Sequence, residues 1–413
     1  MMSRVLTKSE LFGLDSGTKV TLISAGKMAV PMTEVFLEKW NGDIQGGLVA
    51  APVGELPDRR LTFLRVGHPV PTQESVEAGQ RALELARKVD PSGVLILLLS
   101  GGASASLSVP AEGVTLETKI QATEALLRGG VSIHDINCVR KHLSRIKGGW
   151  LAASARGRTL TFAVSDVVGP IEDDPAVIGS GPTTGDPTSF DDALRIVDRA
   201  EVRNHFPFSA REVLQRGRAG YLVETPKPGD PRLTGSAVEI VGSRRDAVRA
   251  AAVKASNLGL DTIVIERPVI GEAREIAPLH LKHVVEVASK LRRPACVMST
   301  GETTVTVKGS GRGGRNQEFG LALVDPLSVL KEDVVVASVA TDGVDGPTEA
   351  AGVIVSGTTL ARSRELELGT PRSYLDRNDS LTFFQALGDL VITGPTDTNV
   401  GDLQVFILMG SSC

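Results

Sequence analysis

The chain has few aromatic residues and few cysteines, and its apolar runs are short. Aromatic residues make up 4% of the 413 residues, which argues against a protein that stacks nucleic-acid bases. The three cysteines, Cys138, Cys296 and Cys413, are odd in number and far apart, so they predict neither a disulfide framework nor a zinc site. The apolar run at residues 94–99 has the length of a strand and is far too short to cross a membrane.

A strong excess of one charge and a targeting segment are also lacking. The 45 basic and 49 acidic residues give a formal charge of −4, which provides no electrostatic footprint for nucleic acid or an anionic membrane. Residues 1–10 lack the apolar core of a signal peptide. We therefore expect a cytoplasmic protein that binds neither nucleic acid nor membrane. A length of 413 residues exceeds the usual size of one hydrophobic core and predicts two domains.

Short β-branched or leucine-rich runs alternate with helical patterns, which predicts an α/β fold with mainly parallel strands. We expect strands at 20–24, 47–51, 94–99, 160–164, 238–241, 262–265, 334–339, 352–355 and 403–409, and helices at 29–40, 73–89, 116–128, 244–258 and 272–291, with another from about 133. The segment 224–235 is dense in Pro and Gly and predicts a linker. The expected domains are therefore 1–235 and 236–413. Two short strands expected at 296–299 and 303–308 indicate antiparallel pairing in the second domain.

Glycine-rich or polar loops directly follow several of the predicted strands, where open α/β sheets bind ligands. Lys27 follows the first strand and could place its ammonium on a phosphate or a carboxylate; it could equally be a solvated surface lysine. The loop 100–104 contains Gly101, Gly102 and Ser104, and its consecutive N–H groups could form an anion nest. The alternative is a tight turn that binds no ligand.

Three further loops carry carboxylates or hydroxyls. Asp166 ends a buried strand and could hold Mg²⁺ or accept the proton of an attacking hydroxyl; otherwise it caps the next turn. Asp342 and Asp345 lie in a glycine-rich loop that suits a cation or substrate hydroxyls, and Thr393 opens a similar loop. Structural turns held by Asx bonds are the alternative for these loops.

The segment 309–318, GSGRGGRNQE, joins a predicted strand to an amphipathic helix. Its glycines permit close approach of a phosphate, and Arg315 at the helix start supplies a charge-assisted fork. The candidate binding residues here are Gly309, Gly311, Gly313, Gly314 and Asn316. The segment matches GxGxxG, but the acidic residue expected about 20 positions later is not well placed, which disfavours a nicotinamide site. Without a Walker motif, phosphoryl transfer would rest on charge neutralisation by Lys, Arg and a metal.

Several motifs occur together along residues 20–409: AGKMA (25–29), SGGASA (100–105), HDINCVRKHLSRIKGG (134–149), SDVVG (165–169), SGPTTGDP (180–187), GETTVTVKGSGRGGRNQE (301–318), ATDGVDGPTEAAG (340–352) and TGPTDTNVGDL (393–403). Together they make the chain resemble the class II glycerate kinases, the glycerate 2-kinase family that carries a C-terminal MOFRL domain. Two positions depart from the family pattern: Ala103 stands where a third glycine is common, and Ser299-Thr300 stands where a Ser-Gly pair is usual.

The resemblance implies that ATP and D-glycerate give 2-phosphoglycerate and ADP, with Mg²⁺. It implies a Rossmann-like three-layer N-terminal domain, a smaller mixed α/β C-terminal domain of the MOFRL type, and an active site in the cleft between them. Catalytic roles would fall on Lys27, Arg315, Asp166 and Asp342, with the two carboxylates also as metal ligands. The backbones of 101–104 and 311–314 would bind phosphate groups. The oligomeric state is left open, including a homo-oligomer.

Two alternatives to a kinase stay open at this stage. A hydroxypyruvate reductase would use NAD(P)H at the glycines of 309–314 and would consume NADH with hydroxypyruvate. A sensor of sugar acids or nucleotides would be stabilised by its ligand and would form no product with any acceptor. The dense set of charged loops after strands makes a purely binding role the weaker of the two.

Overall fold

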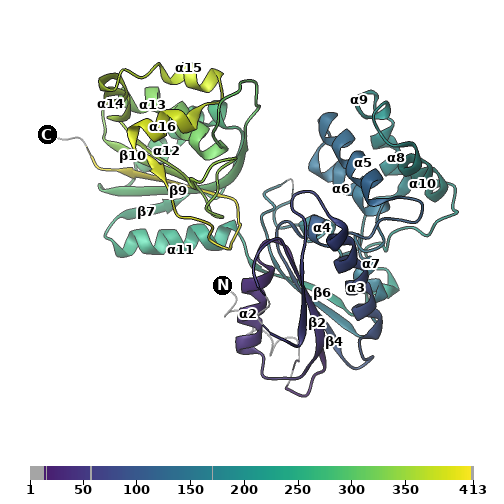
Figure 1. Ribbon diagram of the computed structural model, residues 1–413. Helices are drawn as coiled ribbons and strands as arrows, with labels where there is room; N and C mark the ends of the chain where they lie inside the picture. Colours follow the sequence, from purple (N-terminus) through teal and green to yellow (C-terminus); the bar gives the residue numbers. More distant parts are fainter. Residues whose placement is uncertain (1–13, 15, 56–57, 170, 411–413) are drawn as a thin grey trace. The chain divides into compact units, whose positions relative to one another are not determined.

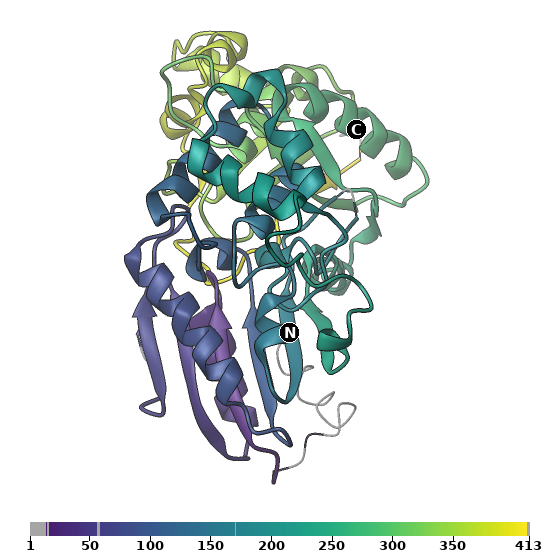
Figure 2. The same cartoon turned by 90° about the vertical axis from the view of Figure 1, so that its right-hand side faces the viewer.

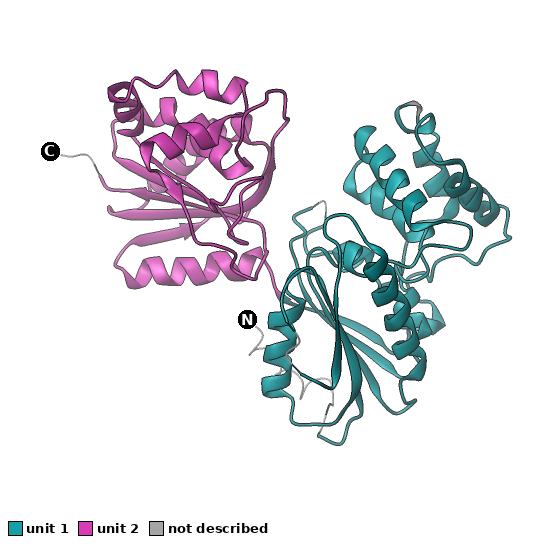
Figure 3. Cartoon of the chain, in the orientation of Figure 1, with its two compact units in different colours: residues 1–241 teal, residues 242–413 magenta. Residues whose placement is uncertain are grey.

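The computed structural model describes residues 14, 16–55, 58–169 and 171–410. They form two compact units, residues 1–241 and 242–413, which are shown in separate colours in Figure 3. Residues 1–10, on which the absence of a signal peptide was judged, and Cys413 lie outside the described residues. Within the described part of the chain, every helix is too short or too polar to serve as a membrane span.

The first unit is built on a six-stranded sheet with the order β3-β2-β1-β4-β5-β6. Its strands are β1 (Val20–Ala25), β2 (Ile44–Ala51), β3 (Leu61–Arg65), β4 (Val94–Leu99), β5 (Arg158–Val164) and β6 (Ser236–Gly242). The pairs from β3 through β5 are parallel, which confirms the expectation of a mainly parallel first sheet. The order 3-2-1-4-5-6 is that of doubly wound nucleotide-binding sheets.

Helices cover both faces of this sheet, so the first unit has three layers. Figure 1 shows α2 (Ala29–Lys39) on one face and α3 (Gln73–Lys88) with α7 (Trp150–Ser154) on the other. β1 and β4 are buried along their whole length, as a strand packed on both faces must be. A capping box between Thr72 and Ser75 fixes the start of α3.

A group of helices with its own apolar core completes the first unit (Figures 1 and 2). It consists of α5 (Leu116–Arg128), α6 (Ile133–His142), α8 (Phe190–Val197), α9 (Ala200–Arg203) and α10 (Phe208–Arg218). Leu126, Val139, Phe190 and Leu214 are among the buried residues of this core. Three short segments, α4 (Ala103–Ser106), η2 (Ile178–Ser180) and η3 (Pro231–Leu233), lie in the connections. The helices α8 to α10 were not predicted from the sequence.

The second unit is a mixed sheet with the order β12-β11-β10-β13-β9-β7, and β8 also pairs with β9. The strands are β7 (Asp261–Val264), β8 (Val269–Glu272), β9 (Ala295–Thr304), β10 (Val334–Ala340), β11 (Gly352–Ser356), β12 (Leu390–Val391) and β13 (Asp402–Leu408). β13 is antiparallel to both β9 and β10, whereas β7 and β8 are parallel to β9. The mixed α/β architecture expected for the second domain is therefore confirmed.

Helices also cover both faces of the second sheet. Figure 1 shows α11 (Arg244–Asn257) on one face and α12 (Ala273–Ala288), α13 (Arg315–Ser328) and α16 (Ser380–Leu387) on the other. The remaining helices are α14 (Thr359–Glu365) and α15 (Pro371–Asp376). An apolar core lies on each face of this sheet, because successive side chains of β9 point to opposite faces. Val297 belongs to the core on the α12–α13 side, and Cys296 and Met298 belong to the core on the α11 side.

The two short strands expected at 296–299 and 303–308 are wrong, because the single strand β9 runs through residues 295–304. Gly301 lies between the two expected strands, where the chain continues as one strand instead of turning. A Cβ at this position would lie 1.9 Å from the carbonyl oxygen of Val269 in β8. The glycine therefore lets β8 approach the middle of the strand rather than ending it.

The segment 224–235 is packed into the first unit rather than extended as a free linker. Glu224 accepts hydrogen bonds from His142 Nε2 at 2.9 Å and from the N–H of Phe190 at 3.0 Å. Burial lowers the pKa of His142, but its bonds to the carbonyl of Cys138 and to Glu224 outweigh burial and raise the pKa to about 9. The expected boundary after residue 235 falls just before β6, and the compact units divide at its end.

Candidate active site

The chain order of the first sheet reverses between β1 and β4, and the loops after these two strands touch each other there. The N–H of Lys27 donates to the carbonyl of Gly101 at 2.9 Å. The N–H of Met28 donates to Ser100 Oγ at 3.0 Å. A crevice outside the carboxyl ends of the strands at such a reversal is where doubly wound sheets bind ligands. The first two predicted loops therefore lie at the position that the fold favours for a ligand.

Glycines make this contact between the loops possible. Gly26 has φ of +114° and Gly102 has φ of +87°, values that favour glycine. A Cβ at Gly26 would lie 2.4 Å from Ser100 Oγ. Ala103, the departure from the family pattern, begins the short helix α4 and is buried, so the side chain at this position packs inward.

The strand-end carboxylate Asp166 lies against the same loop. A Cβ built on Gly101 would be 2.2 Å from Asp166 Oδ2, so the carboxylate lies directly over this glycine. The Cβ position of Gly102 is 3.4 Å from Lys27 Cγ. The structure thus brings Lys27, Asp166 and the Gly101–Gly102 backbone together within the first unit.

His68 belongs to this group and was missed by the sequence reasoning. It follows β3, and its Cδ2 lies 2.8 Å from the Cβ position of Gly102. Burial lowers the pKa of His68, and the charge of Lys27 lowers it further. A neutral imidazole beside Lys27 can donate or accept a hydrogen bond to a bound substrate. The strand before it, β3, was not predicted from the sequence, so the rule that identified the other loops did not reach His68.

In the second unit, Arg315 is held by two carboxylates. Its Nε and Nη2 donate to Asp402 at 2.7 and 3.0 Å, and its Nη1 donates to Glu302 at 2.8 Å. Asp402 begins β13 and its side chain is fully buried. A guanidinium has five N–H donors, so this pairing leaves donors for a ligand while it fixes the direction of the side chain. Asp402 is a second residue that the sequence reasoning missed.

Carboxylates of the loop 341–347 lie close to this ion pair. Asp345 accepts the N–H groups of Asn316 and Gln317 at 3.0 and 2.8 Å, at the start of α13. Burial, helped by the charge of Asp402, raises the pKa of Asp345 to about 6, against the lowering effect of these two bonds. Asp342 accepts the N–H of Val344 in an Asx turn at 3.1 Å.

Burial is the main cause that raises the pKa of Asp402, and the charge of Asp342 raises it as well. The two carboxylates are therefore within electrostatic range of each other. Thr393 Oγ1 lies 2.9 Å from the Cβ position of Gly343, which places Thr393 beside the Asp342 turn. Asn316 is buried, and its amide binds Asp345 and receives a bond from Ser338. Its side chain is therefore engaged within the protein.

The glycines of the 309–314 loop have an internal packing role. A Cβ at Gly309 would lie 2.2 Å from the carbonyl oxygen of Arg377, and at Gly313 it would lie 2.0 Å from Ser380 Oγ. Gly311 and Gly314 are as tightly packed, the first against Asp379 and the second against Asp345. The N–H of Gly311 already donates to Arg377 at 2.9 Å. Close packing is thus sufficient to require these glycines: Gly309, Gly311 and Gly313 pack against the segment 377–380, and Gly314 packs against Asp345.

The topology around this loop differs from a dinucleotide-binding unit. In that unit the strands before and after the glycine-rich loop and its helix are parallel neighbours. Here β9 precedes the loop and β10 follows α13, and the antiparallel strand β13 lies between them. The GxGxxG match therefore lacks the structural context of a nicotinamide site.

Among the described residues, no group of three or more His, Cys, Asp or Glu side chains is arranged to hold a metal ion. Mg²⁺ is commonly bound by only one or two carboxylates together with substrate phosphates. Asp166, at the end of β5 beside Lys27 and Gly101, fits that kind of site. Asp342 belongs to the second unit.

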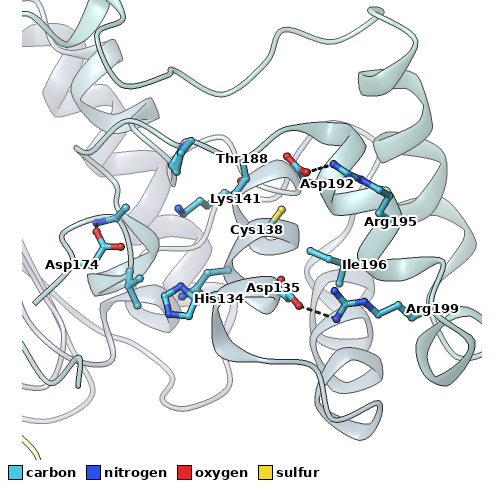
Figure 4. Close-up of a pocket in the computed structure, with 14 residues that line it drawn as sticks. His134, Asp135, Cys138, Lys141, Asp174, Thr188, Asp192, Arg195, Ile196 and Arg199 are labelled. Carbon is cyan, nitrogen blue, oxygen red and sulfur yellow. Dashed lines mark hydrogen bonds and ion pairs between the residues drawn. The ribbon is translucent and has the colours of Figure 1, made fainter. Parts of the chain in front are cut away.

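A cavity of about 430 Å³ in the first unit has walls from α6, α8 and the segment 174–177 (Figure 4). Its charged side chains are largely paired with one another: Asp192 with Arg195, Asp135 with Arg199 and Lys141 with Asp186. Such internal pairing neutralises the wall and offers little to a charged ligand. This cavity is therefore a weaker candidate than the strand-end loops.

The fold and these loops define a protein of two α/β units, the first doubly wound and the second mixed, with charged strand-end loops in each. Residues 1–215 match the family model described as "Domain of unknown function (DUF4147)", and residues 295–402 match the MOFRL family. The chain belongs to this DUF4147–MOFRL family, the class II glycerate 2-kinases, to which its motifs had suggested it belongs.

Two relatives and one crystal structure illustrate the similarity. A "Glycerate 2-kinase" of Pyrococcus horikoshii is 34% identical, over 94% of this chain and 87% of the relative. A "Putative hydroxypyruvate reductase" of Agrobacterium vitis is 38% identical, over 94% of this chain and 99% of the relative. A crystal structure of glycerate kinase from Thermotoga maritima has a TM-score of 0.83 at 33% identity, covering 98% of this chain and 94% of that one.

Proposed function

We propose that this protein transfers the γ-phosphoryl group of ATP to the 2-hydroxyl of D-glycerate, giving 2-phosphoglycerate and ADP. The similarity to proteins named glycerate 2-kinase extends over nearly the whole chain, including the strand-end loops of both units. The observation that carries the proposal is the grouping of Lys27, Asp166 and the Gly101–Gly102 backbone where the strand order of the first sheet reverses. A cation, a carboxylate and backbone N–H groups are what phosphoryl transfer requires of a protein.

The roles follow from the chemistry of these groups. Lys27 and Arg315 would neutralise charge on the transferring phosphoryl group or orient the glycerate carboxylate. Asp166 would accept the proton of the attacking hydroxyl or hold Mg²⁺, and Asp342 would share this work. Mg²⁺, when bound with the nucleotide, would neutralise the phosphate oxygens. That residues of both units act in one active site, in the cleft between the domains, stays a prediction. The proposed substrates are metabolites of the cytoplasm, where we place the protein.

Hydroxypyruvate reduction is the competing function, because two Agrobacterium vitis relatives carry that name. It would require NAD(P)H at the 309–314 loop. The position of β13 between β9 and β10, and the packing of the loop glycines against the segment 377–380, count against a dinucleotide there. Oxidation of NADH with hydroxypyruvate, without ADP formation from ATP and glycerate, would favour the reductase.

One coupled assay tests the proposal. The protein is incubated with ATP, Mg²⁺ and D-glycerate, and enolase is added to convert only the 2-phospho product to phosphoenolpyruvate. We expect phosphoenolpyruvate to form when ATP, Mg²⁺ and D-glycerate are all present, and no phosphoglycerate mutase should be needed. If product appears only after the mutase is added, the phosphoryl group goes to the 3-hydroxyl. If no ADP forms with glycerate, the kinase assignment is wrong.

A further inference from the structure

A second cavity of the first unit contains buried positive charge. It has a volume of about 340 Å³ and is lined by residues that include Lys119 from α5, Arg140 from α6 and Lys147. We call it the basic cavity. His68, Gly102 and Ser104 line the same cavity, so it adjoins the group around Lys27. Its volume is in the range of pockets that bind small molecules.

The two lysines of the basic cavity hydrogen-bond to neutral oxygens. Lys147 is 1% exposed, and its Nζ donates to the carbonyls of Ser104 and Leu107 at 2.7 and 3.2 Å. Lys119 is 5% exposed, and its Nζ donates to Ser108 Oγ at 3.1 Å. Within the described ranges of the chain, none of the three cations forms an ion pair with a carboxylate. The two lysines therefore hydrogen-bond to neutral oxygens, and in that part of the chain none of the three basic groups has a carboxylate counter-ion.

This arrangement is costly for the empty protein. Burial and, to a smaller extent, the charge of Arg140 lower the pKa of Lys119 to about 7. Burial also lowers the pKa of Lys147 well below its usual value, with further contributions from Lys119 and Arg140. Neighbouring cations without an anion repel each other, and a buried charge without a partner is strongly disfavoured. An anion that enters the basic cavity would relieve both penalties.

The number of cations distinguishes between the two substrates of the proposed reaction. Glycerate carries a single carboxylate, which can serve as counter-ion to only one of the three basic groups. The phosphate chain of a nucleotide carries several negative charges at neutral pH. The remaining walls include the apolar side chains of Val70, Ile120 and Leu127, against which a nucleoside can pack. The larger cavity with paired charges has no comparable unmet positive potential.

We propose that the basic cavity binds the phosphate chain of the nucleotide, with Lys119, Arg140 and Lys147 as its counter-ions. This inference rests on the proposed kinase function and adds the place of one substrate. It leaves the adjoining side, around Lys27 and Asp166, for the acceptor and the transferred phosphoryl group.

Arg140→Gln is the best variant to test this inference. Arg140 is partly buried and makes no side-chain hydrogen bond within the described part of the chain, so its loss should not unfold the protein. Lys147 is unsuitable, because its removal would leave two buried carbonyls unsatisfied. Arg145→Gln is a matched control: Arg145 is exposed, and the change removes the same charge five positions away without altering the cavity wall.

Isothermal titration calorimetry of the full chain would measure binding of ADP, inorganic tripolyphosphate and D-glycerate. We expect Arg140→Gln to weaken ADP and tripolyphosphate about 10-fold or more, the usual effect of losing a hydrogen bond between charged groups. Glycerate affinity should be unchanged, and Arg145→Gln should leave all three ligands close to wild type. Equal weakening of ligand binding in both variants would mean that the effect comes from the net charge of the protein and not from the basic cavity, and it would overturn the inference.

Proton uptake gives a second readout. Because the pKa of Lys119 is about 7 in the empty cavity, an incoming polyanion should raise it and take up protons at pH 7.5 to 8. The apparent binding enthalpy of tripolyphosphate should therefore differ between buffers of different ionisation enthalpy. His68, Arg140, Lys147 and Glu124 also line the cavity, so Lys119→Met is needed to assign the uptake. A difference that is unchanged in Lys119→Met would count against the inference.

The outcomes also separate this inference from the proposed function. If Arg140→Gln weakens glycerate and spares ADP and tripolyphosphate, the basic cavity belongs to the acceptor and the inference is overturned, while wild-type turnover still supports the kinase. If the wild type shows no turnover but binds ADP in an Arg140-dependent way, the kinase assignment fails and the cavity remains a polyphosphate site. If neither polyphosphate ligand responds to Arg140→Gln, the inference fails whatever the coupled assay shows.

Discussion

The ion pair of Arg315 and Asp402 predicts that a single substitution will damage both stability and activity, for different reasons. Asp402 is fully buried and receives two hydrogen bonds from the guanidinium. In Arg315→Met, its carboxylate would remain buried without a cation. Breaking a buried pair from one side costs about 3–5 kcal/mol. At a few degrees per kcal/mol, the melting temperature should fall by on the order of 10 °C.

The pH dependence of this loss has a definite sign. Burial and the charge of Asp342 raise the pKa of Asp402, and Arg315 opposes them. Without Arg315, the folded-state pKa of Asp402 would lie well above its unfolded value. A carboxyl group with a raised folded pKa favours the folded state at low pH and loses that contribution as pH rises through the folded pKa. The difference between wild type and Arg315→Met should therefore be small near pH 5 and larger near pH 8.

The double variant Arg315→Met/Asp402→Asn separates the structural role from the catalytic one. Removing the stranded charge should recover most of the lost stability, because no buried carboxylate remains. Turnover should stay at least about 100-fold below wild type in both variants, since the cation proposed to act on the phosphoryl group is still missing. Urea titrations at pH 5 and 8, with the coupled enolase assay, measure both quantities. Turnover that returns with stability would refute a direct role of Arg315 in catalysis.

Three further predictions follow from other parts of the molecule. Lys27→Ala should abolish turnover while circular dichroism and melting temperature stay unchanged; near-normal turnover would disprove its role. The pKa of His142 is raised from 6.5 to about 9, so its protonation should add at most about 3 kcal/mol to the free energy of unfolding below pH 6.5, and this stability is lost as pH rises through 9. In urea titrations, His142→Gln should remove this added stability and its loss at high pH. The same loss of stability with pH in the variant would contradict the prediction. Gly309→Ala places a Cβ 2.2 Å from a backbone carbonyl oxygen and should lower the free energy of unfolding by about 1–3 kcal/mol. The control Gly235→Ala, whose Cβ would have only ordinary contacts, should lower it by about 0.5 kcal/mol or less. Equal losses of stability in the two variants would argue against the packing role of Gly309.

The regular elements of both sheets could be predicted where a strong local pattern exists. The run of β4 is apolar throughout, and the predicted range of 94–99 is that of the strand. The helix at 116–128 is bounded by Thr115 and Gly129, which cap its two ends in the structure. The order of the strands was not predictable, because it depends on pairing between distant segments. Gly301 shows the limit of local reasoning: a glycine that suggests a turn can instead admit a neighbouring strand.

The same limit explains which site residues were found. Lys27, Asp166 and Gly101 each follow a predicted strand, so a local rule identified them. Asp402 has no local signal, because its importance arises from the antiparallel pairing that sets it opposite Gly301 in β9 and from the contact with Arg315. The cations of the basic cavity come from separate elements, and only the packing of α5 and α6 brings Lys119 and Arg140 to one wall.

The charge balance of the two groups suggests how the substrates are distributed. Arg315 is already offset by Asp402 and Glu302, so a phosphate that binds it must compete with carboxylates held at hydrogen-bonding distance. The cations Lys119 and Lys147 have no such competitor in the described part of the chain. A polyanion therefore gains more in the basic cavity than at Arg315, because there it meets basic groups that have no carboxylate counter-ion among the described residues rather than an existing ion pair. Arg315 is better suited to the transition state, where charge on the transferring oxygens increases and its remaining N–H donors are already oriented.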